Sequence, residues 1–253
     1  MKKTVLITGA SSGIGEACAH VFAKEQYRLI LTARRAERLA SVRQSLEAEY
    51  NAEVFCLHFD VRSREEVEHQ LQNLPEEWND IDVLINNAGL SLGLEPFYEG
   101  DVNDWETMID TNVKGLLYVS KVVASAMIKK QAGHIINIGS VAGKESYANG
   151  NVYCSTKAAV DSLSRSMRID LVKHGIKVTA IHPGAVETEF SIIRFKGDVQ
   201  RAKNVYQGFE PLHPEDVAEV IYFAASRPAH VNINDLLLMP TAQANVTTIH
   251  RNS

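Results

Sequence analysis

Short aliphatic runs alternate with longer amphipathic stretches along almost the whole sequence. The aliphatic runs are nearly continuous, which is typical of strands buried on both faces of a parallel sheet. The stretches between them carry apolar residues at three- and four-residue spacing, which predicts helices packed on that sheet. The pattern therefore predicts an α/β fold, a doubly wound seven-stranded parallel sheet with helices on both faces. The expected strands are 4–8, 29–32, 54–58, 83–86, 134–138, 177–181 and 236–239, and the expected helices are 14–24, 36–50, 65–73, 113–130, 152–173 and 214–225.

The length of 253 residues is compatible with one or two domains. No segment repeats at a fixed period, and no linker rich in proline, serine or glycine divides the chain. Because the alternation is unbroken, we expect one domain over residues 1–253. Hydrophobic residues make up 45% of the chain, so it can bury a sizeable core without disulfides or metals.

Charge and cysteine content exclude several classes of partner. The formal net charge of −5 provides no positive field for nucleic acid or anionic lipid. No stretch approaches the ~20 apolar residues of a membrane span, and the apolar run after Lys2 and Lys3 is too short for a secretory signal. The cysteines are too few and the histidines too dispersed to form a metal site. We therefore expect a cytoplasmic protein with no nucleic-acid, membrane or metal partner.

A glycine-rich turn follows the first expected strand and opens the first expected helix. Its spacing is G-x-x-x-G-x-G over residues 9–15. Missing side chains let a pyrophosphate approach backbone N–H groups, and the helix N-terminus adds a favourable dipole end. The alternative is a glycine turn that binds nothing, but its place between strand and helix favours nucleotide binding. The expected contacts are Gly9, Ser11, Ser12, Gly13, Ile14 and Gly15.

The end of the second expected strand discriminates between nicotinamide cofactors. Folds that bind NAD usually place a carboxylate there, on the ribose 2′-hydroxyl. This chain has Arg34 and Arg35 instead, whose guanidinium groups can hold a 2′-phosphate. The alternative is that both arginines merely begin a solvated helix. We expect NADP(H) as the cofactor.

Two further strand ends carry polar residues with more than one possible role. Asp60 can accept a hydrogen bond from an adenine amino group, or it can cap the helix that begins near Arg64. The small residues after Asn87 let the chain pass close to a bound ribose. The Asn87 amide can also tie neighbouring strands together, and both roles can hold.

Tyr153 and Lys157 stand four positions apart at the start of a long expected helix, so they share one helix face. A nearby ammonium favours phenolate over phenol, which would lower the tyrosine pKa and make Tyr153 a general acid–base. Ser140 ends the preceding strand, where its hydroxyl can bind a substrate oxygen. Asn112 is expected where another helix passes the same rim of the sheet. Each residue alone is common, but the combination points to catalysis.

These residues together resemble the short-chain dehydrogenase/reductase family, over nearly the whole chain. The resemblance implies a Rossmann fold and hydride transfer between NADP(H) and a carbonyl or alcohol. Tyr153 would donate the proton, Ser140 would orient the substrate oxygen, and Lys157 would lower the tyrosine pKa and hold the nicotinamide ribose. Asn112 would hold a water in a proton relay. The matching motifs are Thr8-Gly9-x-x-x-Gly13-x-Gly15, Asn86-Asn87-Ala88-Gly89, Asn112, Ser140, Tyr153-x-x-x-Lys157 and Pro183-Gly184.

The resemblance also assigns the remaining cofactor contacts. The adenosine side would touch Asp60, Val61 and Asn87. The nicotinamide would lie on the segment 183–188, with contacts from Pro183, Gly184, Val186 and Thr188. His182 departs from the commoner asparagine or serine of the family, and we expect no effect on the chemistry.

The substrate loop, about residues 185–212, carries two cations among apolar residues. They can face a substrate carboxylate, or they can face water on a mobile lid. The motifs at 87–93, 104–112, 189–198 and 228–234 resemble the NADP-dependent 3-hydroxy acid dehydrogenases of that family. This resemblance implies serine, allo-threonine or 3-hydroxypropionate as the class of substrate, Arg194 as the carboxylate ligand, with Ser140 and Tyr153 on the substrate oxygen, and a homotetramer. The alternatives are a reductase of neutral ketones or diketones, and a non-catalytic NADP(H)-binding sensor.

Overall fold

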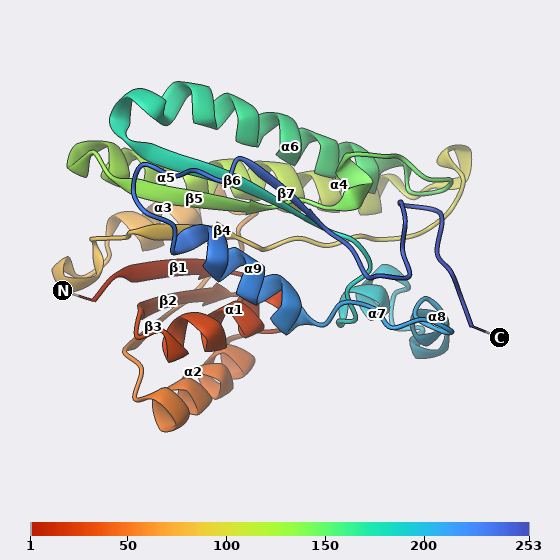
Figure 1. Cartoon of the computed structure of the whole chain (residues 1–253), viewed down its shortest axis with the longest axis horizontal. Coiled ribbons are helices and arrows are strands. Elements are labelled where there is room, and N and C mark those ends of the chain that lie inside the picture. The colour runs from red at the N-terminus through yellow and green to blue at the C-terminus, as the bar shows by residue number, and fades with distance from the viewer. Residues whose placement is uncertain (1, 253) are drawn as a thin grey trace.

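Seven parallel strands form one sheet in the order β3-β2-β1-β4-β5-β6-β7 (Figure 1). The computed structural model describes residues 2–252. The chain builds outward from β1 to β3 and then returns to pair β4 with β1. The strand order therefore reverses between β1 and β4, which is where doubly wound sheets bind ligands. The strands are β1 Thr4–Thr8, β2 Arg28–Ala33, β3 Val54–His58, β4 Val83–Asn86, β5 Gly133–Ile138, β6 Ile176–Pro183 and β7 Asp235–Leu238.

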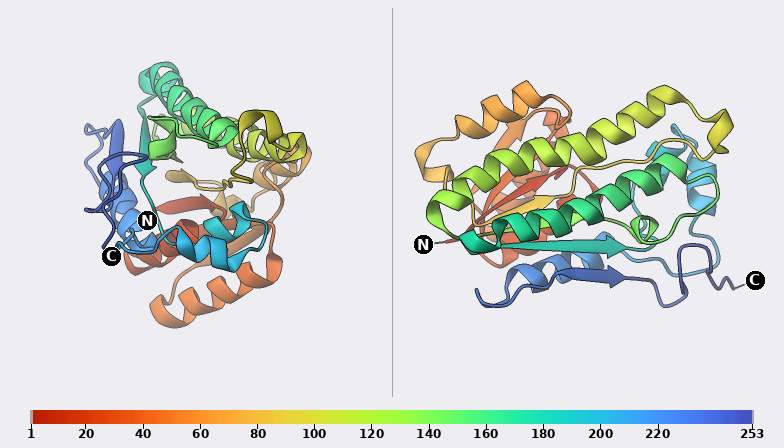
Figure 2. Two further views of the ribbon diagram at one scale, coloured as in Figure 1. Left: turned by 90° about the vertical axis from the view of Figure 1, so that its right-hand side faces the viewer. Right: turned by 90° about the horizontal axis from the view of Figure 1, so that it is seen from above.

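Helices cover both faces of the sheet, as its two-sided apolar strands require (Figure 2). One core contains Phe22, Leu39 and Ile221, from α1, α2 and α9. The other contains Val67 and Val123, from α3 and α5, with α6 packed beside them. The fold confirms the expected doubly wound sheet. The covering helices are α1 Gly13–Lys24, α2 Ala36–Tyr50, α3 Arg64–Gln72, α5 Leu116–Lys130, α6 Asn151–Leu171 and α9 Pro214–Ala225.

The segment before α5 differs from the expectation of one helix over 113–130. Helix α4 spans Val102–Ile109, and a π-helical turn over Asp110–Gly115 joins it to α5. The side chain of Asp101 caps α4 by accepting a hydrogen bond from the Asn103 N–H. The helix was missed because it is only 8 residues long and half polar. The extra turn matters because π-helical turns are frequent at functional sites.

The substrate loop is closed at its base and helical within. Ala185 accepts a hydrogen bond from the Leu212 N–H, and Glu187 donates one to the Leu212 carbonyl. Two short helices lie between these ends, α7 Phe190–Arg194 and α8 Val199–Asn204. They lie beyond the carboxyl ends of the strands (Figure 1). Within residues 2–252, no helix combines the length and apolar character that crossing a bilayer needs.

Candidate active site

A cleft of about 480 Å³ runs along the carboxyl ends of the strands, past the reversal between β1 and β4. Residues from all parts of the chain line it, from the glycine turn to the substrate loop. Three of the predicted site residues, Gly15, Asn112 and Arg194, lie outside this lining. The predicted residues that line it are Gly9, Ser11, Ser12, Gly13, Ile14, Arg34, Arg35, Asp60, Val61, Asn87, Ser140, Tyr153, Lys157, Pro183, Gly184, Val186 and Thr188.

The glycine turn depends on its missing side chains in two ways. Gly9 and Gly13 have φ angles of +68° and +57°, which favour glycine. A Cβ on Gly15 would lie 2.4 Å from the Gly9 carbonyl oxygen and 2.5 Å from Asn87 Nδ2. Gly15 therefore allows α1 to pack against the strand ends. The predicted cofactor contact of Gly15 stays a prediction.

Asn87 joins β4 to the end of β1. Its Nδ2 donates to the carbonyls of Thr8 and Gly9 at 2.9 and 3.2 Å. The Thr8 hydroxyl accepts from the backbone N–H groups of Asn87 and Ala88, both at 3.0 Å. These bonds confirm that the amide ties neighbouring strands. A cofactor contact of Asn87 stays a prediction.

The two arginines after β2 point to different partners. Arg35 Nη2 donates to the hydroxyls of Ser11 and Ser12 at 3.2 and 2.8 Å, and its Nη1 donates to Glu189 at 3.1 Å. Arg34 Nη1 lies 3.8 Å from the carboxylate of Asp60. Arg35 is thus preorganised beside the glycine turn, where a phosphate on the ribose would lie.

Asp60 does not cap α3, which corrects one of its two expected roles. The cap is Ser63, whose hydroxyl accepts from the Glu66 N–H. Asp60 instead accepts hydrogen bonds from the backbone N–H and Nε of Arg62, at 3.0 and 2.9 Å. Burial opposes ionisation of Asp60, but the bonds from Arg62 outweigh it and hold its pKa below the usual value. Asp60 is therefore an anion in the lining of the cleft, and its predicted contact with adenine stays a prediction.

Three of the predicted catalytic residues meet where β5 ends and α6 begins. Tyr153 and Lys157 are both buried, on the same face of α6. Lys157 Nζ donates to the carbonyl of Ile138 at 2.9 Å, which fixes the lysine against the end of β5. The Ser140 hydroxyl accepts from the Ala142 N–H at 3.1 Å and remains exposed to the cleft. The structure thus brings the serine, tyrosine and lysine to one wall.

The pKa of Tyr153 does not fall as the sequence predicted. Burial raises the pKa of Tyr153, while the charge of Arg194 and a hydrogen bond with Ser140 oppose that rise. Burial also lowers the pKa of Lys157 to about 8. Lys157 Nζ is directed at the Ile138 carbonyl, and Arg194 is the cation whose charge lowers the pKa of Tyr153.

Asn112 lies in the π-helical turn, and its side-chain amide makes three hydrogen bonds. Its Oδ1 accepts from the Leu90 N–H at 2.8 Å, and its Nδ2 donates to the Leu90 carbonyl and the Thr156 hydroxyl at 2.8 and 3.0 Å. A Cβ on Gly89 would lie 3.2 Å from Asn112 Oδ1 and 3.5 Å from Lys157 Nζ, so both approach this glycine. The predicted water-holding role of Asn112 stays a prediction.

Arg194 reaches the catalytic tyrosine from the substrate loop. Its Nε donates to the Ser91 hydroxyl and its Nη2 to the Tyr147 hydroxyl, both at 3.0 Å. Its guanidinium carbon lies 5.1 Å from the ring centroids of Tyr153 and Phe190. Sequence patterns did not predict Ser91, Tyr147 or Phe190 at this site, because each is an ordinary residue in a loop or a short helix.

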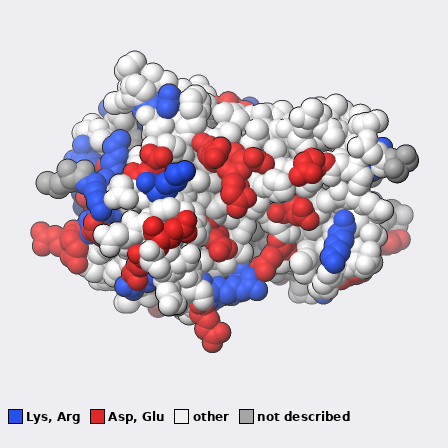
Figure 3. Space-filling view, turned by 60° about the horizontal axis from the view of Figure 1, so that its bottom comes forward, with Lys and Arg blue, Asp and Glu red and all other residues white. Residues whose placement is uncertain are grey.

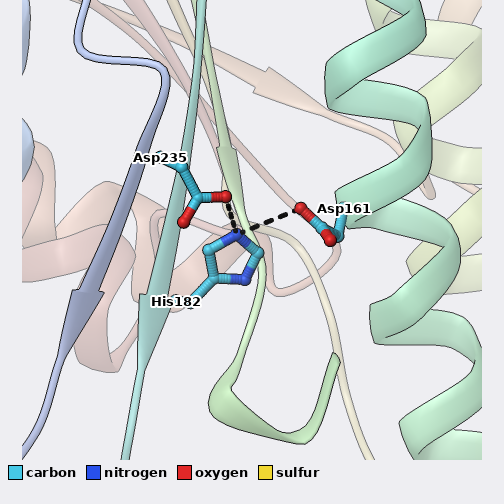
Figure 4. Close-up of side chains that lie close together, drawn as sticks. All are labelled: Asp161, His182 and Asp235. Atoms are coloured by element: carbon cyan, nitrogen blue, oxygen red, sulfur yellow. Dashed lines mark ion pairs between the residues drawn. The ribbon is translucent and has the colours of Figure 1, made fainter. Parts of the chain in front are cut away.

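His182 is not isolated, contrary to what its place in the sequence indicated. Figure 4 shows its imidazole facing Asp161 from α6 and Asp235 from β7. Its Nε2 lies 3.6 Å from Asp161 Oδ1 and 3.2 Å from Asp235 Oδ2. Lys144 Nζ contacts the same two carboxylates at 3.0 and 2.6 Å.

Asp161 and His182 are buried and Asp235 is exposed, and one possible ligand atom from each lies within 4.8 Å of the others. These three residues are close enough in space to share a metal ion, although they are dispersed in the sequence. The ammonium of Lys144 already pairs with both carboxylates, and Arg165 pairs with Asp161, so a metal cation would have to displace Lys144. Burial and the charge of Lys144 lower the pKa of His182 and favour the neutral imidazole. The group therefore acts as an ion-pair network beside the strand end that carries Ser140.

The surface charge agrees with the mild net charge. On the face shown in Figure 3, basic and acidic side chains lie interspersed in small groups. The positive charges of Arg35 and Arg194 therefore matter locally, at the cleft and beside it, rather than through a broad field.

Comparisons with known proteins point to one family. The model of the short chain dehydrogenase family matches residues 3–197. The chain is 48% identical over 249 residues to the NADP-dependent 3-hydroxy acid dehydrogenase YdfG of Salmonella typhi, covering 98% of this chain and 99% of that protein. It is 43% identical over 244 residues to the serine 3-dehydrogenase of Agrobacterium fabrum, covering 96% of each.

Solved structures show the same likeness. The closed form of a serine dehydrogenase complexed with NADP+ superposes with a TM-score of 0.92 at 47% identity, covering 98% of this chain and 99% of that one. The serine dehydrogenase from Escherichia coli has a TM-score of 0.82 at 44% identity, covering 95% and 99%.

Proposed function

The chain belongs to the short-chain dehydrogenase/reductase family, and on this basis we propose that it is an NADP(H)-dependent oxidoreductase of small 3-hydroxy acids. The proposal rests on the lining of the cleft, which contains Ser140, Tyr153 and Lys157. Arg194 places a positive charge beside the ring of Tyr153. The relatives named above act on 3-hydroxy acids or serine.

The residues of the cleft fit NADP(H). The glycine turn offers backbone N–H groups at the start of α1, where a diphosphate is bound best. Arg35 and the hydroxyls of Ser11 and Ser12 suit a 2′-phosphate. Pro183, Gly184, Val186 and Thr188 line the same cleft and would hold the nicotinamide.

The chain's own residues supply the proton chemistry. Bound NADP(H) supplies or takes up the hydride. In reduction, the Tyr153 hydroxyl donates its proton to the substrate oxygen, while the Ser140 hydroxyl donates a hydrogen bond that orients this oxygen. In oxidation, the Tyr153 phenolate takes that proton back. Lys157 favours the phenolate and binds the nicotinamide ribose, and Asn112 holds a water that links Lys157 to solvent.

Arg194 would bind the substrate carboxylate. A bidentate guanidinium–carboxylate pair fixes both the position and the orientation of a small substrate. Its place beside Tyr153 puts the carboxylate within a few bonds of the reacting carbon, as a 3-hydroxy acid requires. Serine, allo-threonine and 3-hydroxypropionate fit this description.

A second candidate activity is the reduction of neutral ketones or diketones. It is favoured by the apolar side chains of Leu90, Phe190 and Ile193 in the cleft lining. It is also favoured because Ser91 and Tyr147 already accept hydrogen bonds from Arg194. A neutral substrate would leave those bonds intact.

A substrate panel decides between the candidates. NADP+ reduction is followed with D- and L-serine, the threonine stereoisomers, 3-hydroxypropionate and 3-hydroxyisobutyrate, with NAD+ as the control. NADPH oxidation is followed with neutral ketones and diketones. We expect the highest kcat/KM for a carboxylate substrate with NADP+. Preference for neutral carbonyls would support the second candidate, and NADP+ binding without any turnover would point to a sensor.

We also propose a homotetramer in the cytoplasm. Large apolar side chains are exposed on two faces, Ile169 and Val172 at 75% and 68% near the end of α6, and Phe223 and Leu237 at 48% and 50% on α9 and β7. Exposed apolar patches of this kind favour subunit contacts. All three cysteines are free thiols, as suits a reducing compartment. Light scattering should give four times the chain mass, and Ile169→Asp should lower it.

A further inference from the structure

Glu189 of the substrate loop is bound to two arginines of the adenosine side. Its carboxylate accepts from Arg38 Nη1 at 2.7 Å with both oxygens, and from Arg35 Nη1 at 3.1 Å. Arg35 is the residue whose other nitrogen already contacts Ser11 and Ser12. A carboxylate of the loop therefore lies where an anion of the cofactor is expected.

The backbone holds Glu189 in this place. It directly precedes α7, and it lines both the main cleft and a smaller hollow of about 320 Å³ between α1 and α2. The methyl group of Thr188 lies 3.2 Å from where a Cβ of Gly13 would be. The loop thus crosses the glycine turn closely, and Glu189 faces the two arginines from its far side.

The ion pairs of Glu189 with Arg35 and Arg38 are exposed enough for a ligand anion to replace the carboxylate. The side chains of Arg35, Arg38 and Glu189 are 41%, 50% and 41% exposed. Hydrogen bonds from Arg38 and then Arg35 lower the pKa of Glu189, so it is an anion at neutral pH. Exposed pairs of this kind contribute little to stability, which suits a contact that a ligand can replace.

We propose that Glu189 is a cofactor-specificity residue, whose carboxylate competes with the 2′-phosphate of NADP(H) for Arg35. This inference rests on the proposed function, because it requires that NADP(H) binds in the cleft. When the 2′-phosphate binds, Arg35 turns to it, and the two anions repel each other. Arg38 then holds Glu189 alone, so the loop remains attached to α2 by one arginine instead of two.

The competition acts on NADP(H) and not on NAD(H). The ribose 2′-hydroxyl of NAD(H) is uncharged and neither needs Arg35 nor repels Glu189. Glu189 therefore weakens NADP(H) binding selectively and accelerates its release. Arg38 is a positioning residue in this scheme, because it draws Glu189 away from Arg35.

The test compares Glu189→Gln with Glu16→Gln in the full-length protein. Glu16 lines the same hollow and carries the same charge, but no ion pair of it occurs among residues 2–252. Dissociation constants are measured by calorimetry for NADP+ and for NAD+. Glu189→Gln should bind NADP+ about three- to five-fold more tightly, the range of one exposed ion pair. Its NAD+ affinity should change by less than about two-fold, and Glu16→Gln should leave the ratio of the two constants unchanged.

A second pair of variants tests whether Arg38 draws Glu189 away from Arg35 when NADP+ binds. Arg38→Gln should weaken NADP+ binding about two- to five-fold, since Glu189 then remains on Arg35. The double variant Arg38→Gln/Glu189→Gln should regain the affinity of Glu189→Gln.

Weaker NADP+ binding by Glu189→Gln, an equal change for both cofactors, or a double variant as weak as Arg38→Gln would each overturn the inference. The proposed function fails separately, if the wild-type protein does not bind NADP+ at all.

Discussion

The guanidinium of Arg194 lies 5.1 Å from the ring centroid of Tyr153 and is held there by hydrogen bonds to Ser91 and Tyr147. It offsets part of the rise in tyrosine pKa that burial causes. One cation is therefore close to both the proton donor and the expected substrate carboxylate. We propose that this geometry couples substrate binding to proton transfer.

Arg194→Gln should raise KM for 3-hydroxy acids about ten-fold or more, because a charge-assisted pair with the carboxylate is lost. KM for neutral ketones should change by less than about two-fold. The control is Arg201→Gln, because Arg201 belongs to the same loop but lies over the ring of Phe195. Steady-state kinetics with both substrate classes check this, and equal effects on both classes would contradict the role of Arg194.

The same variant should shift the pH profile. Arg194 lowers the pKa of Tyr153, so its removal raises that pKa further. Oxidation needs the phenolate, and its rate increases as pH rises through the tyrosine pKa. The rising limb of kcat/KM for alcohol oxidation should therefore move to higher pH in Arg194→Gln. An unchanged limb, measured with a neutral alcohol, would show that Arg194 does not act on the tyrosine.

Tyr153→Phe should lose about a thousand-fold or more in kcat, because no other hydroxyl replaces the proton donor. NADP+ binding should stay within about two-fold of wild type, since the ring and its packing are kept. Steady-state kinetics give kcat, and calorimetry gives the Kd for NADP+. Tyr98→Phe, which alters an exposed tyrosine far from the cleft lining, serves as the control. Near-normal turnover of Tyr153→Phe would refute the assignment.

Lys157→Met should make the pH dependence of stability flatter in the cofactor-free protein. Burial lowers the pKa of Lys157 from 10.5 to about 8 in the folded state. Between these values the unfolded chain binds the proton and the folded chain does not, so wild-type stability increases with pH there. Below about pH 8 the buried lysine is charged in both states, and its desolvation penalty is present in full.

The measurement is urea unfolding at several pH values. The free energy of unfolding of Lys157→Met, relative to wild type, should decrease steadily from about pH 8 to 10.5. A difference that stays constant over that window would exclude the lowered lysine pKa.

Lys144→Met should destabilise the fold by about 1–3 kcal/mol, because it leaves the buried Asp161 beside the exposed Asp235 with less compensating charge. Lys121→Met, on the exposed side of α5, should change stability by no more than about 0.5 kcal/mol. Urea unfolding at neutral pH compares the two. Equal effects would mean that the ion-pair network contributes nothing to stability.

Local sequence determined the architecture and the placing of Tyr153 and Lys157 on one face of a helix. Both ends of every strand were predicted to within two residues, because parallel strands buried on both faces need continuous apolar runs. The glycine turn was predicted because only missing side chains allow its φ angles and close approach. Tyr153 and Lys157 were predicted because helical spacing places residues four apart on one face.

Only the tertiary structure decided which side chains meet across the chain. Arg194 and Ser91 are 103 positions apart, and Glu189 and Arg35 are 154 apart. His182 likewise contacts Asp161 and Asp235, which are distant in sequence. These contacts form because α6, β6 and β7 pack together. No local pattern encodes such pairs, because the periodicity of a strand or helix determines which face a residue occupies but not its partner. The direction of the Tyr153 pKa shift therefore depended on burial and on Arg194, which the sequence by itself did not place.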